Sequence, residues 1–397
     1  MKDITVVGLG YIGLPTAIIL AKAGYNVYGF DVNKNTINTL NSGKIHIIEN
    51  NLQEAFKEAL ELNRFKAYSE IQKADVYIIC VPTPFKEERK ADLSYVESAT
   101  KEVAKVLKKG DLVILESTVP PGTTAYMTEI LEKESGLSAN EFYTAHCPER
   151  VLPGKILYEL EHNDRIIGSA SPDSARRAKE LYESFVKEGT CYITDDVTAE
   201  MCKLVENTYR DINIAYANEL STICDKLGID VFKLIELANK HPRVNIMTPG
   251  VGVGGHCIAV DPWFIVENFK NEAKLIETAR KVNTYKPMWV CEKIEQDINY
   301  DKTIKIGVLG LAYKENIDDL RESPSIELAN KLLQKGYNVV ACEPNASLDK
   351  IGEIKIESTN KVIEESDYLV ITLAHKEFID LKKEILKKKH FNCIGLR

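Results

Sequence analysis

The sequence predicts an α/β fold in which two parallel-sheet domains are joined by a central helical domain with one long helix. Three observations carry this prediction: short β-rich runs alternate with helical stretches in the first half, the alternation stops from about Thr198, and it returns from residue 303. Strands that alternate with helices imply βαβ units and a parallel sheet. We place the domains at 1–196, 197–300 and 301–397.

The first domain contains six strand candidates separated by helical segments. Strands are expected at 4–8, 26–31, 76–81, 112–116, 142–146 and 165–168. Helices are expected at 13–23, 34–41, 51–61, 94–108, 123–135 and 172–187. Residues 4–21 are uncharged, but three glycines and Pro15 interrupt this run and no signal-peptide pattern accompanies it. No other stretch is long and apolar enough to span a bilayer, so we expect no membrane segment.

The central and last domains follow a different pattern. Apolar residues recur at helical spacing over 198–227, which predicts one long helix, and Gly228 fits its end. Helices are also expected at 229–240 and 271–299, around a Gly/Pro-rich loop at 241–262. The last domain then runs as a strand, a helix, a strand, a short helix and a strand, at 303–310, 325–335, 338–344, 359–365 and 368–374.

Charge and cysteine content exclude several classes of protein. The 397 residues include 51 Lys and Arg against 59 Asp and Glu, a net charge of −8. A general nucleic-acid binder needs a basic face, so we expect no nucleic-acid partner, although a local basic pocket for a small anion remains compatible. The nine cysteines are irregularly spaced without a CxxC pair, which disfavours a disulfide framework and favours a reducing, cytoplasmic setting.

A glycine-rich turn indicates a dinucleotide site. Gly8, Gly10 and Gly13 form a GxGxxG pattern that follows a predicted strand and opens a predicted helix. The glycines permit a tight turn, close approach to a pyrophosphate and close helix–strand packing. Asp31, at the end of the second strand, would accept hydrogen bonds from ribose hydroxyls and repel a 2′-phosphate. The pattern predicts a Rossmann-like domain that binds NAD rather than NADP.

Two more loops follow predicted strands in this domain, at 81–84 and 116–122. Ligands on open α/β sheets bind beyond the carboxyl ends of strands, which favours a binding role for both loops. The residues alone allow a second interpretation, in which Thr123 or Thr124 simply begins the next helix.

The segment 249–263 combines four glycines with Cys257 and Asp261. Glycines let the backbone approach a ligand closely, and exposed N–H groups would lower the pKa of a thiol and hold an oxyanion. We therefore interpret Cys257 as a nucleophile. Most of the other eight cysteines are expected to be buried, and all eight to be replaceable by Ser or Ala with only packing costs.

A zinc site is the alternative for this region. His146–Cys147 and His256–Cys257 supply four possible ligands. Adjacent side chains point apart, however, and neither pair has the usual short ligand spacing. We expect no metal, and we expect both histidines to pack or to form hydrogen bonds.

Two further groups of residues, each with at least one basic side chain, are candidates for binding a substrate. Lys203 and Asn207 are four residues apart on the predicted long helix, with Glu206 beside them, so the pair either faces a substrate or lies in solvent. Lys314 and Arg321 follow a turn at Gly307 and Gly310, which suggests a second phosphate-bearing ligand.

These residues resemble the UDP-glucose/GDP-mannose dehydrogenase family of NAD-dependent nucleotide-sugar 6-dehydrogenases. The matching segments span nearly the whole chain in the family's order: GLGYIGLP (8–15), VPTP (81–84), STVPPGTT (117–124), PER (148–150), KxxxN (203–207), GVGGHC (252–257) with Asp261, and GLAYKENIDDLRESPS (310–325). Segments 146–168 and 241–266 are similar to the UDP-N-acetylmannosamine dehydrogenase branch of the family. The family's last strand commonly ends in an Asp-Thr-Arg-like segment with a tail, whereas this sequence ends Ile394-Gly395-Leu396-Arg397, which leaves the role of Arg397 open.

The resemblance implies a four-electron oxidation of C6 of a UDP-N-acetylhexosamine with two NAD⁺, by way of a cysteine thiohemiacetal and thioester. The implied catalytic residues are the nucleophile Cys257, then Lys203, Asn207 and Asp261 around the reacting carbon, and Thr118 and Glu149 for water and protons. The implied cofactor-binding residues are Gly8, Gly10, Tyr11, Ile12, Gly13, Asp31, Thr83, Thr118 and Arg321. The implied substrate-binding residues are Arg150, Val151, Lys203, Asn207, Arg243, Gly254, Tyr313 and Lys314.

The resemblance also implies a homodimer or higher homo-oligomer built on the helical domain, with Arg243 serving the neighbouring subunit's pocket. UDP-N-acetyl-D-mannosamine is the favoured substrate, followed by UDP-N-acetylglucosamine, UDP-N-acetylgalactosamine, UDP-glucose and GDP-mannose. A two-electron β-hydroxyacid dehydrogenase and a non-catalytic nucleotide sensor are the rival classes. The first would need neither Cys257 nor the last α/β domain.

Overall fold

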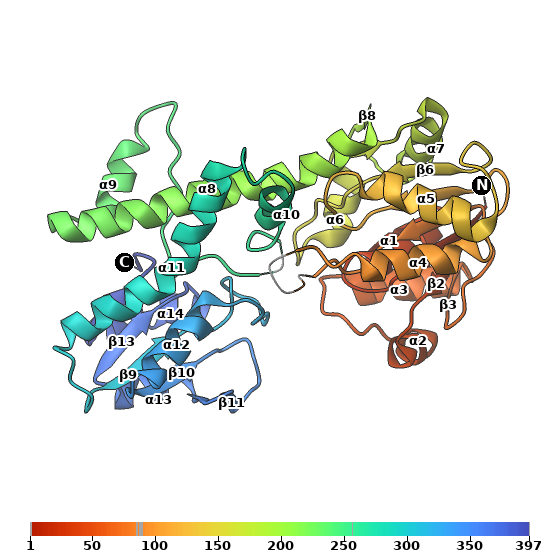
Figure 1. The fold of residues 1–397 in the computed structure, drawn as a ribbon. Coiled ribbons are helices and arrows are strands. Elements are labelled where there is room, and N and C mark those ends of the chain that lie inside the picture. The colour runs from red at the N-terminus through yellow and green to blue at the C-terminus, as the bar shows by residue number, and fades with distance from the viewer. Residues whose placement is uncertain (1, 85, 87–89, 256, 397) are drawn as a thin grey trace. The chain divides into compact units, whose positions relative to one another are not determined.

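The structure is a computed structural model that describes residues 2–84, 86, 90–255 and 257–396. The chain divides into two compact units, unit 1 at Met1–Val205 and unit 2 at Glu206–Arg397. The 32-residue helix α8 (Asp196–Leu227) begins in unit 1 and ends in unit 2 (Figure 1). This helix confirms the single long helix expected for the central region.

Unit 1 is built on an eight-stranded sheet with the order β3-β2-β1-β4-β5-β6-β7-β8. Its strands are β1 (Asp3–Val7), β2 (Asn26–Phe30), β3 (Phe65–Tyr68), β4 (Val76–Ile79), β5 (Leu112–Leu115), β6 (Tyr143–His146), β7 (Arg165–Gly168) and β8 (Cys191–Thr194). Its helices before α8 are α1 (Gly13–Lys22), α2 (Lys34–Asn41), α3 (Leu52–Glu61), α4 (Ser94–Ala104), α5 (Thr123–Ser135), α6 (Ile156–His162) and α7 (Pro172–Glu183). The strands pair in parallel except β6 and β7, which meet antiparallel.

Helices cover both faces of this sheet. One apolar cluster joins the sheet to α1, α3, α6 and α7, and another joins its opposite face to α4 and α5. A strand buried on both faces has apolar residues without alternation, as β4 and β5 do. The uncharged run at 4–21 is accordingly a buried strand and helix, β1 and α1. Of the helices described, none combines the length and apolarity that a bilayer crossing requires.

The turn between β1 and α1 depends on close backbone packing. Gly8 adopts a φ of +91°, and a Cβ added to Gly13 would lie 1.8 Å from the carbonyl oxygen of Gly8. By contrast, a Cβ added to Gly10 meets nothing within 4 Å. Gly13 is therefore required by the fold, whereas Gly10 keeps open space at the start of the helix.

Unit 2 contains the rest of the central helices and a six-stranded sheet with the order β11-β12-β10-β9-β13-β14. Its strands are β9 (Lys305–Leu309), β10 (Asn338–Cys342), β11 (Lys350–Ile351), β12 (Ile354–Ile356), β13 (Tyr368–Ile371) and β14 (Lys389–Asn392). Its helices after α8 are α9 (Val231–Ala238), α10 (Asp261–Asn268), α11 (Lys274–Asp297), α12 (Pro324–Gln334), α13 (Thr359–Glu365), α14 (Lys376–Asp380) and α15 (Lys382–Ile385). Helices α11 and α12 pack on one face, and α13, α14 and α15 on the other.

A buried ion pair ties α8 to α11 within unit 2. Arg280 donates to Asp211 at 2.6 Å, and Asn283 donates to the same carboxylate at 2.8 Å. All three side chains are buried. A buried charge left without its partner is costly, so this contact holds the two helices in one register.

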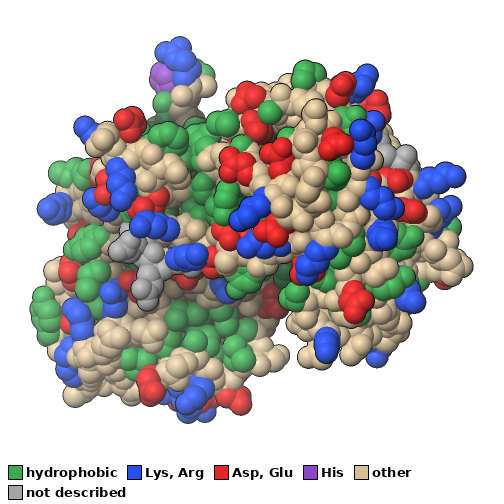
Figure 2. All heavy atoms as spheres, turned by 45° about the vertical axis from the view of Figure 1, so that its right-hand side comes forward, with side chains coloured by type: hydrophobic (Ala, Val, Ile, Leu, Met, Phe, Trp, Pro, Cys, Tyr) green, Lys and Arg blue, Asp and Glu red, His purple; other side chains and the backbone are tan. Residues whose placement is uncertain are grey.

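Positive and negative side chains are mixed on the surface that Figure 2 displays. Elsewhere in the structure, charged side chains form short-range pairs, such as Lys22 with Glu58 and Arg176 with Asp173. Exposed pairs of this kind contribute little to stability. On that face the basic residues are not gathered into one surface.

The predicted elements are confirmed to within a few residues, but several weaker ones are missing from the prediction. The strands β3, β8, β11, β12 and β14 and the short helices α6, α14 and α15 carry too few residues to show a period. Helix α10 is also missing from the prediction, because it is buried along most of its length and so shows no polar face. Both sheets are mainly parallel, as expected, although β7 and β11 each pair antiparallel with a neighbour. Pairing direction depends on the path of the connecting chain, which local sequence does not encode.

Replacing Gly13 with Ala should destabilise unit 1 by about 3 kcal/mol or more, because the new methyl group would overlap the carbonyl of Gly8. Replacing Gly10 with Ala is the matched control and should change the free energy of unfolding by less than about 0.5 kcal/mol. Urea unfolding followed by circular dichroism measures both. Equal stability of the two variants would contradict the close contact.

Candidate active site

The GxGxxG turn lies at the carboxyl edge of the unit 1 sheet, where the strand order reverses between β1 and β4. No side chain caps the N-terminus of α1, and the open space beside Gly10 lies at the same point. Uncapped amides at a helix N-terminus bind phosphate. Tyr11 is exposed and Ile12 half-buried beside them. These residues fit the pyrophosphate of a dinucleotide.

Asp31 completes this turn from the end of β2. Its Oδ2 accepts a hydrogen bond from Leu9 N at 2.9 Å, and its Oδ1 accepts one from Asn33 N at 2.8 Å. The side chain stays partly exposed, so its remaining lone pairs are open to further donors. The position fits the ribose contact that the sequence predicts.

The loops after β4 and β5 are joined to each other. Thr83 Oγ1 donates to the carbonyl oxygen of Thr118 at 2.6 Å, and Ser117 Oγ accepts from Val81 N at 3.0 Å. Two segments that the sequence singled out separately therefore form one wall at the carboxyl edge of the sheet.

The start of α5 shows a residue that sequence reasoning missed. The helix begins at Thr123, as expected, but Glu200 of α8 accepts hydrogen bonds from Gly122 N at 2.6 Å and from Thr124 N at 2.7 Å. The cap thus comes from a residue 76 positions further along the chain. Only the fold could reveal it.

Glu149 lies buried in the loop after β6. Its carboxylate is 3.2 Å from the guanidinium of Arg165, which is also buried, and it accepts a hydrogen bond from Arg150 N at 2.7 Å. Val151 follows, half-buried. Arg165 compensates the buried charge of Glu149, so the carboxylate is held in one orientation.

A second buried carboxyl group, Glu116, was also missed. It accepts hydrogen bonds from Tyr182 Oη at 2.6 Å, from Cys80 Sγ at 3.1 Å and from Thr16 Oγ1 at 3.3 Å. Burial raises the pKa of Glu116 and raises that of the Cys80 thiol well above its usual value. Cys80 is therefore an unreactive thiol although it lies at the end of β4. The sequence feature that could have indicated Glu116 is its place as a single acidic residue directly after the apolar strand β5.

Unit 2 brings Asn207 and Asp261 together. Asn207 Nδ2, on α8, donates to Asp261 Oδ2, at the first position of α10, at 2.6 Å, and both side chains are buried. The interpretation of Asn207 as a solvated residue is thereby excluded. Lys203 lies one turn earlier on α8 and is half-buried.

Cys257 is exposed one turn before α10. Its carbonyl oxygen accepts hydrogen bonds from Asp261 N at 2.8 Å and Val260 N at 3.0 Å, so the turn runs directly into the helix. A thiolate at the positive end of a helix is stabilised by the helix dipole. The structure therefore places Cys257 in an exposed turn directly before α10, and its role as a nucleophile stays a prediction.

The glycines before Cys257 pack against protein rather than only facing a ligand. A Cβ at Gly254 would lie 2.3 Å from the carbonyl oxygen of Glu322, and one at Gly255 would lie 2.8 Å from the ring of Tyr313. Gly255 N also donates to Arg321 O at 3.3 Å. The segment that carries Cys257 is thus in direct contact with the segment that carries Tyr313 and Arg321.

The remaining substrate residues lie in loops of unit 2. Lys314 is exposed after β9, and Arg243 is exposed after α9. Arg321 is held by Asp319 through two contacts, at 2.8 and 2.6 Å. Within their own units, the structure brings together Thr83 with Thr118, Glu149 with Arg150, Asn207 with Asp261, and Gly254 with Tyr313.

The burial of most other thiols and of His146 fits the packing roles expected for them. Six cysteines are buried, Cys80 and Cys202 are half-buried, and only Cys257 is exposed. His146 is fully buried with no hydrogen-bond partner on either ring nitrogen, and burial lowers its pKa to about 3, so it packs as a neutral ring. His256 and Arg397 lie outside the described residues. Among the described residues no group of three or more His, Cys, Asp or Glu side chains is arranged to hold a metal ion.

Comparison with known proteins covers the whole chain. Residues 2–186 match the NAD binding domain of the UDP-glucose/GDP-mannose dehydrogenase family, 197–285 its central domain and 307–393 its UDP binding domain. The chain is 48% identical over 398 residues to the UDP-N-acetyl-D-mannosamine dehydrogenase of Campylobacter jejuni, covering 96% of this chain and 98% of that protein. It is 46% identical to the NDP-N-acetyl-D-galactosaminuronic acid dehydrogenase of Ralstonia solanacearum, covering 98% of this chain and 94% of that protein.

A solved structure agrees with these matches. The UDP-N-acetyl-D-mannosamine dehydrogenase of Pyrococcus horikoshii superimposes with a TM-score of 0.93 at 42% identity, covering 100% of this chain and 96% of that one. With the dinucleotide turn, the exposed Cys257 and all three domains in place, the chain belongs to the UDP-glucose/GDP-mannose dehydrogenase family and is an NAD-dependent nucleotide-sugar dehydrogenase.

Proposed function

We propose that the protein oxidises C6 of UDP-N-acetyl-D-mannosamine to the carboxylate and so produces UDP-N-acetyl-D-mannosaminuronate. The single observation that carries the four-electron chemistry is the exposed Cys257 in the turn before α10, beside a buried Asn207–Asp261 pair in the same unit. The choice of sugar is supported by the similarity to dehydrogenases of that name at 48% identity. The same chemistry on UDP-N-acetylglucosamine, UDP-N-acetylgalactosamine or UDP-glucose is the alternative, and one relative is named for a galactosaminuronic acid.

The first oxidation needs a base for the C6 hydroxyl. When bound, NAD⁺ supplies the hydride acceptor for this oxidation and, as a second molecule, for the next. Lys203, or a water held by Asp261, takes the hydroxyl proton as the alcohol becomes an aldehyde. Asp261 is oriented for this role by the hydrogen bond from Asn207.

The second oxidation needs a covalent adduct. The thiolate of Cys257 attacks the aldehyde carbon, and the carbonyl oxygen takes a proton to give a thiohemiacetal. Loss of a hydride and a proton from this adduct leaves a thioester, and water then replaces the sulfur, which releases the carboxylate and restores the thiol. Lys203 and Asn207 stabilise the oxyanions, while Asp261, Thr118 or Glu149 orients the water.

The substrate's nucleotide is held by unit 2 in this proposal. Lys314 neutralises the diphosphate, with Tyr313 beside it, and Arg150 and Val151 contribute to the sugar pocket. Arg243 serves the pocket of a neighbouring subunit, and Arg321 reaches the NAD site. The domain boundaries that we propose are 1–196, 197–300 and 301–397.

A homodimer built on the central helices is part of the proposal. Large apolar side chains are exposed along α8 and α9, namely Tyr209, Tyr216, Ile223, Leu227, Leu234 and Leu237. Contiguous exposed apolar surface is typical of an interaction face. No disulfide joins any of the nine cysteines, all of which lie in the described residues, and this supports a reducing, cytoplasmic setting for the assembly.

Replacing Cys257 with Ala should lower the rate of acid formation at least about 1,000-fold, because the aldehyde can no longer form an oxidisable adduct. Binding of UDP should persist. The control is Cys224→Ala, a buried cysteine of unit 2, which should retain activity. Mass spectrometry of the product measures the acid, and near-normal acid formation by the Cys257 variant would exclude the covalent step.

A panel of five nucleotide sugars tests the substrate and the stoichiometry together. UDP-N-acetyl-D-mannosamine should give the highest kcat/KM, ahead of UDP-N-acetylglucosamine, UDP-N-acetylgalactosamine, UDP-glucose and GDP-mannose. Absorbance at the NADH band should show two NADH for each sugar consumed. A ratio of one would exclude the four-electron reaction, and binding without any NADH would favour a sensor.

Replacing Asp31 with Asn should raise the KM for NAD about 10-fold or more, because charged hydrogen bonds to the ribose contribute about 1.5–3 kcal/mol. The preference for NAD over NADP should fall by a similar factor, since the repulsion of a 2′-phosphate is lost. Asp173→Asn, a surface acid of α7, is the control. Steady-state kinetics with both cofactors gives the ratio, and an unchanged preference would remove Asp31 from the cofactor site.

A further inference from the structure

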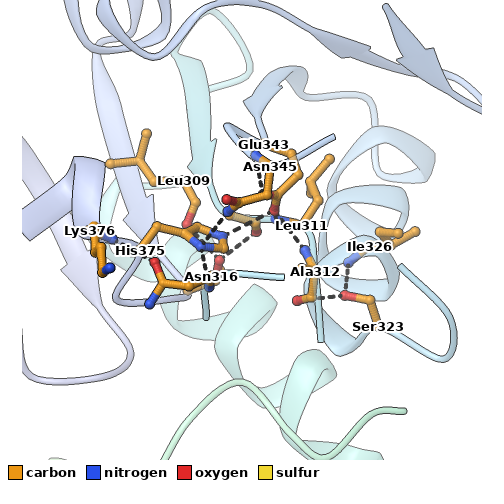
Figure 3. A network of polar contacts seen from close by, with 12 residues as sticks. Leu309, Leu311, Ala312, Asn316, Ser323, Ile326, Glu343, Asn345, His375 and Lys376 are labelled. Atoms are coloured by element: carbon orange, nitrogen blue, oxygen red, sulfur yellow. Dashed lines mark hydrogen bonds and ion pairs between the residues drawn. The ribbon is translucent and has the colours of Figure 1, made fainter. Parts of the chain in front are cut away.

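Three loops of unit 2 meet at the carboxyl edge of its sheet. They follow β9, β10 and β13, which are neighbouring strands in the order β10-β9-β13. The loop after β9 is the turn 311–316, which carries Tyr313 and Lys314. The other two loops supply Glu343 and His375, both buried, and Figure 3 shows these two side chains pointing toward each other, with Leu311, Ala312 and Asn316 of the turn around them.

Glu343 holds the first end of the turn. Its Oε2 accepts hydrogen bonds from Leu311 N at 2.7 Å and from Ala312 N at 2.8 Å. Burial by itself would raise the pKa of this carboxyl group, but the donors from His375 and the two amides outweigh burial and lower it. Glu343 is therefore ionised and fully engaged.

His375 holds the second end of the turn. Asn316 N donates to its Nδ1 at 2.9 Å, and Asn345 Nδ2 lies 3.0 Å from the same nitrogen. Because a backbone N–H can only donate, Nδ1 is unprotonated and Nε2 carries the proton, which points to Glu343 Oε2 at 3.2 Å. One His–Glu pair thus connects both ends of the turn.

Asn316 shows that the turn is held in an uncommon shape. It adopts a φ of +60°, a backbone conformation that residues other than glycine seldom adopt. Its backbone N–H is bound by His375, and its Oδ1 accepts a hydrogen bond from Lys376 N at 2.9 Å. The residue is fixed from two sides, whereas Lys314, in the middle of the turn, is exposed.

Glu343 occupies the place in unit 2 that Asp31 occupies in unit 1, the end of the strand next to the first one. Asp31 binds one amide of the turn and stays partly exposed, as a ribose contact requires. Glu343 is 4% exposed; it accepts hydrogen bonds from two amides at the first end of the turn and faces His375, which holds the second end. The residue at this position is therefore open to a ligand in unit 1, whereas in unit 2 it binds the loop itself.

We propose that the His375–Glu343 pair is the positioning device of the substrate's nucleotide site: it clamps both ends of the turn 311–316 and so holds Tyr313 and Lys314 against the diphosphate. The proposal rests on the proposed function, in which Lys314 binds UDP. Because the pair acts on the binding turn rather than on C6 chemistry, it controls affinity for UDP and the KM for the sugar nucleotide. It leaves kcat and the KM for NAD unchanged.

The test compares variants that remove both ends of the clamp with variants that keep one. His375→Phe removes both contacts and keeps an aromatic ring beside Phe378. His375→Asn keeps an acceptor for Asn316, and His375→Gln keeps a donor to Glu343. His390→Phe, a half-buried histidine of β14 in the same unit, is the control.

Calorimetric titration with UDP alone gives the affinity, and steady-state kinetics gives kcat and both KM values. His375→Phe should weaken UDP binding and raise the sugar-nucleotide KM at least about 10-fold, with kcat within about 2-fold. The UDP affinity and sugar-nucleotide KM of the Asn and Gln variants should lie between those of His375→Phe and those of the wild type. If His375→Phe does not fold, these two variants test the proposal. Lys314→Ala by itself should also weaken UDP binding. Adding His375→Phe to Lys314→Ala should lower the affinity for UDP by less than about a further 2-fold.

The outcomes separate the two proposals. If the wild type binds no UDP, the proposed function fails. If the wild type and all three His375 variants bind UDP equally well, the function stands and the clamp is wrong. A loss that is equally large with and without Lys314, or that appears in kcat instead of KM, also overturns the clamp.

Discussion

The same kind of contact occurs in both α/β units. A carboxylate at the end of one strand accepts hydrogen bonds from backbone amides of the turn that follows the neighbouring strand. In unit 1 Asp31 binds Leu9 N, and in unit 2 Glu343 binds Leu311 N and Ala312 N. These turns lie where the strand order reverses, so each faces the place where a ligand binds an open parallel sheet. The ligand sites of the two units depend on this contact, because it sets the direction in which each turn leaves its strand.

Three buried carboxyl groups of the described residues each lie against a buried basic side chain. Glu149 is paired with Arg165, Asp211 with Arg280, and Glu343 with His375. Such pairs add little net stability compared with apolar packing, but breaking one is expensive. The pairs therefore act mainly by fixing positions. Each one joins two separate segments of the chain that carry, or adjoin, residues of the candidate active site.

The nine cysteines illustrate how environment separates identical side chains. Burial raises the pKa of the thiols of Cys147, Cys342 and Cys393 to about 12, which keeps them protonated. Among the nine cysteines, Cys257 alone is exposed, in the turn before a helix whose first residue is the buried Asp261. The difference between the buried thiols and the proposed nucleophile is thus one of exposure to solvent and place in the fold, not of residue type.

The sequence by itself determined the alternation of strands and helices, the long helix α8, the GxGxxG turn with Asp31, and the choice of Cys257, because each leaves a local pattern of spacing or composition. The edge strand β3, the antiparallel β7, the cap that Glu200 provides for α5 and the Glu116 network leave no such pattern. Likewise, the sequence marked Lys314 but not the His375–Glu343 pair beneath its turn. Only the tertiary structure decided these features, because they arise from contacts between residues that are far apart along the chain and meet only when the parallel strands bring their carboxyl ends to one edge.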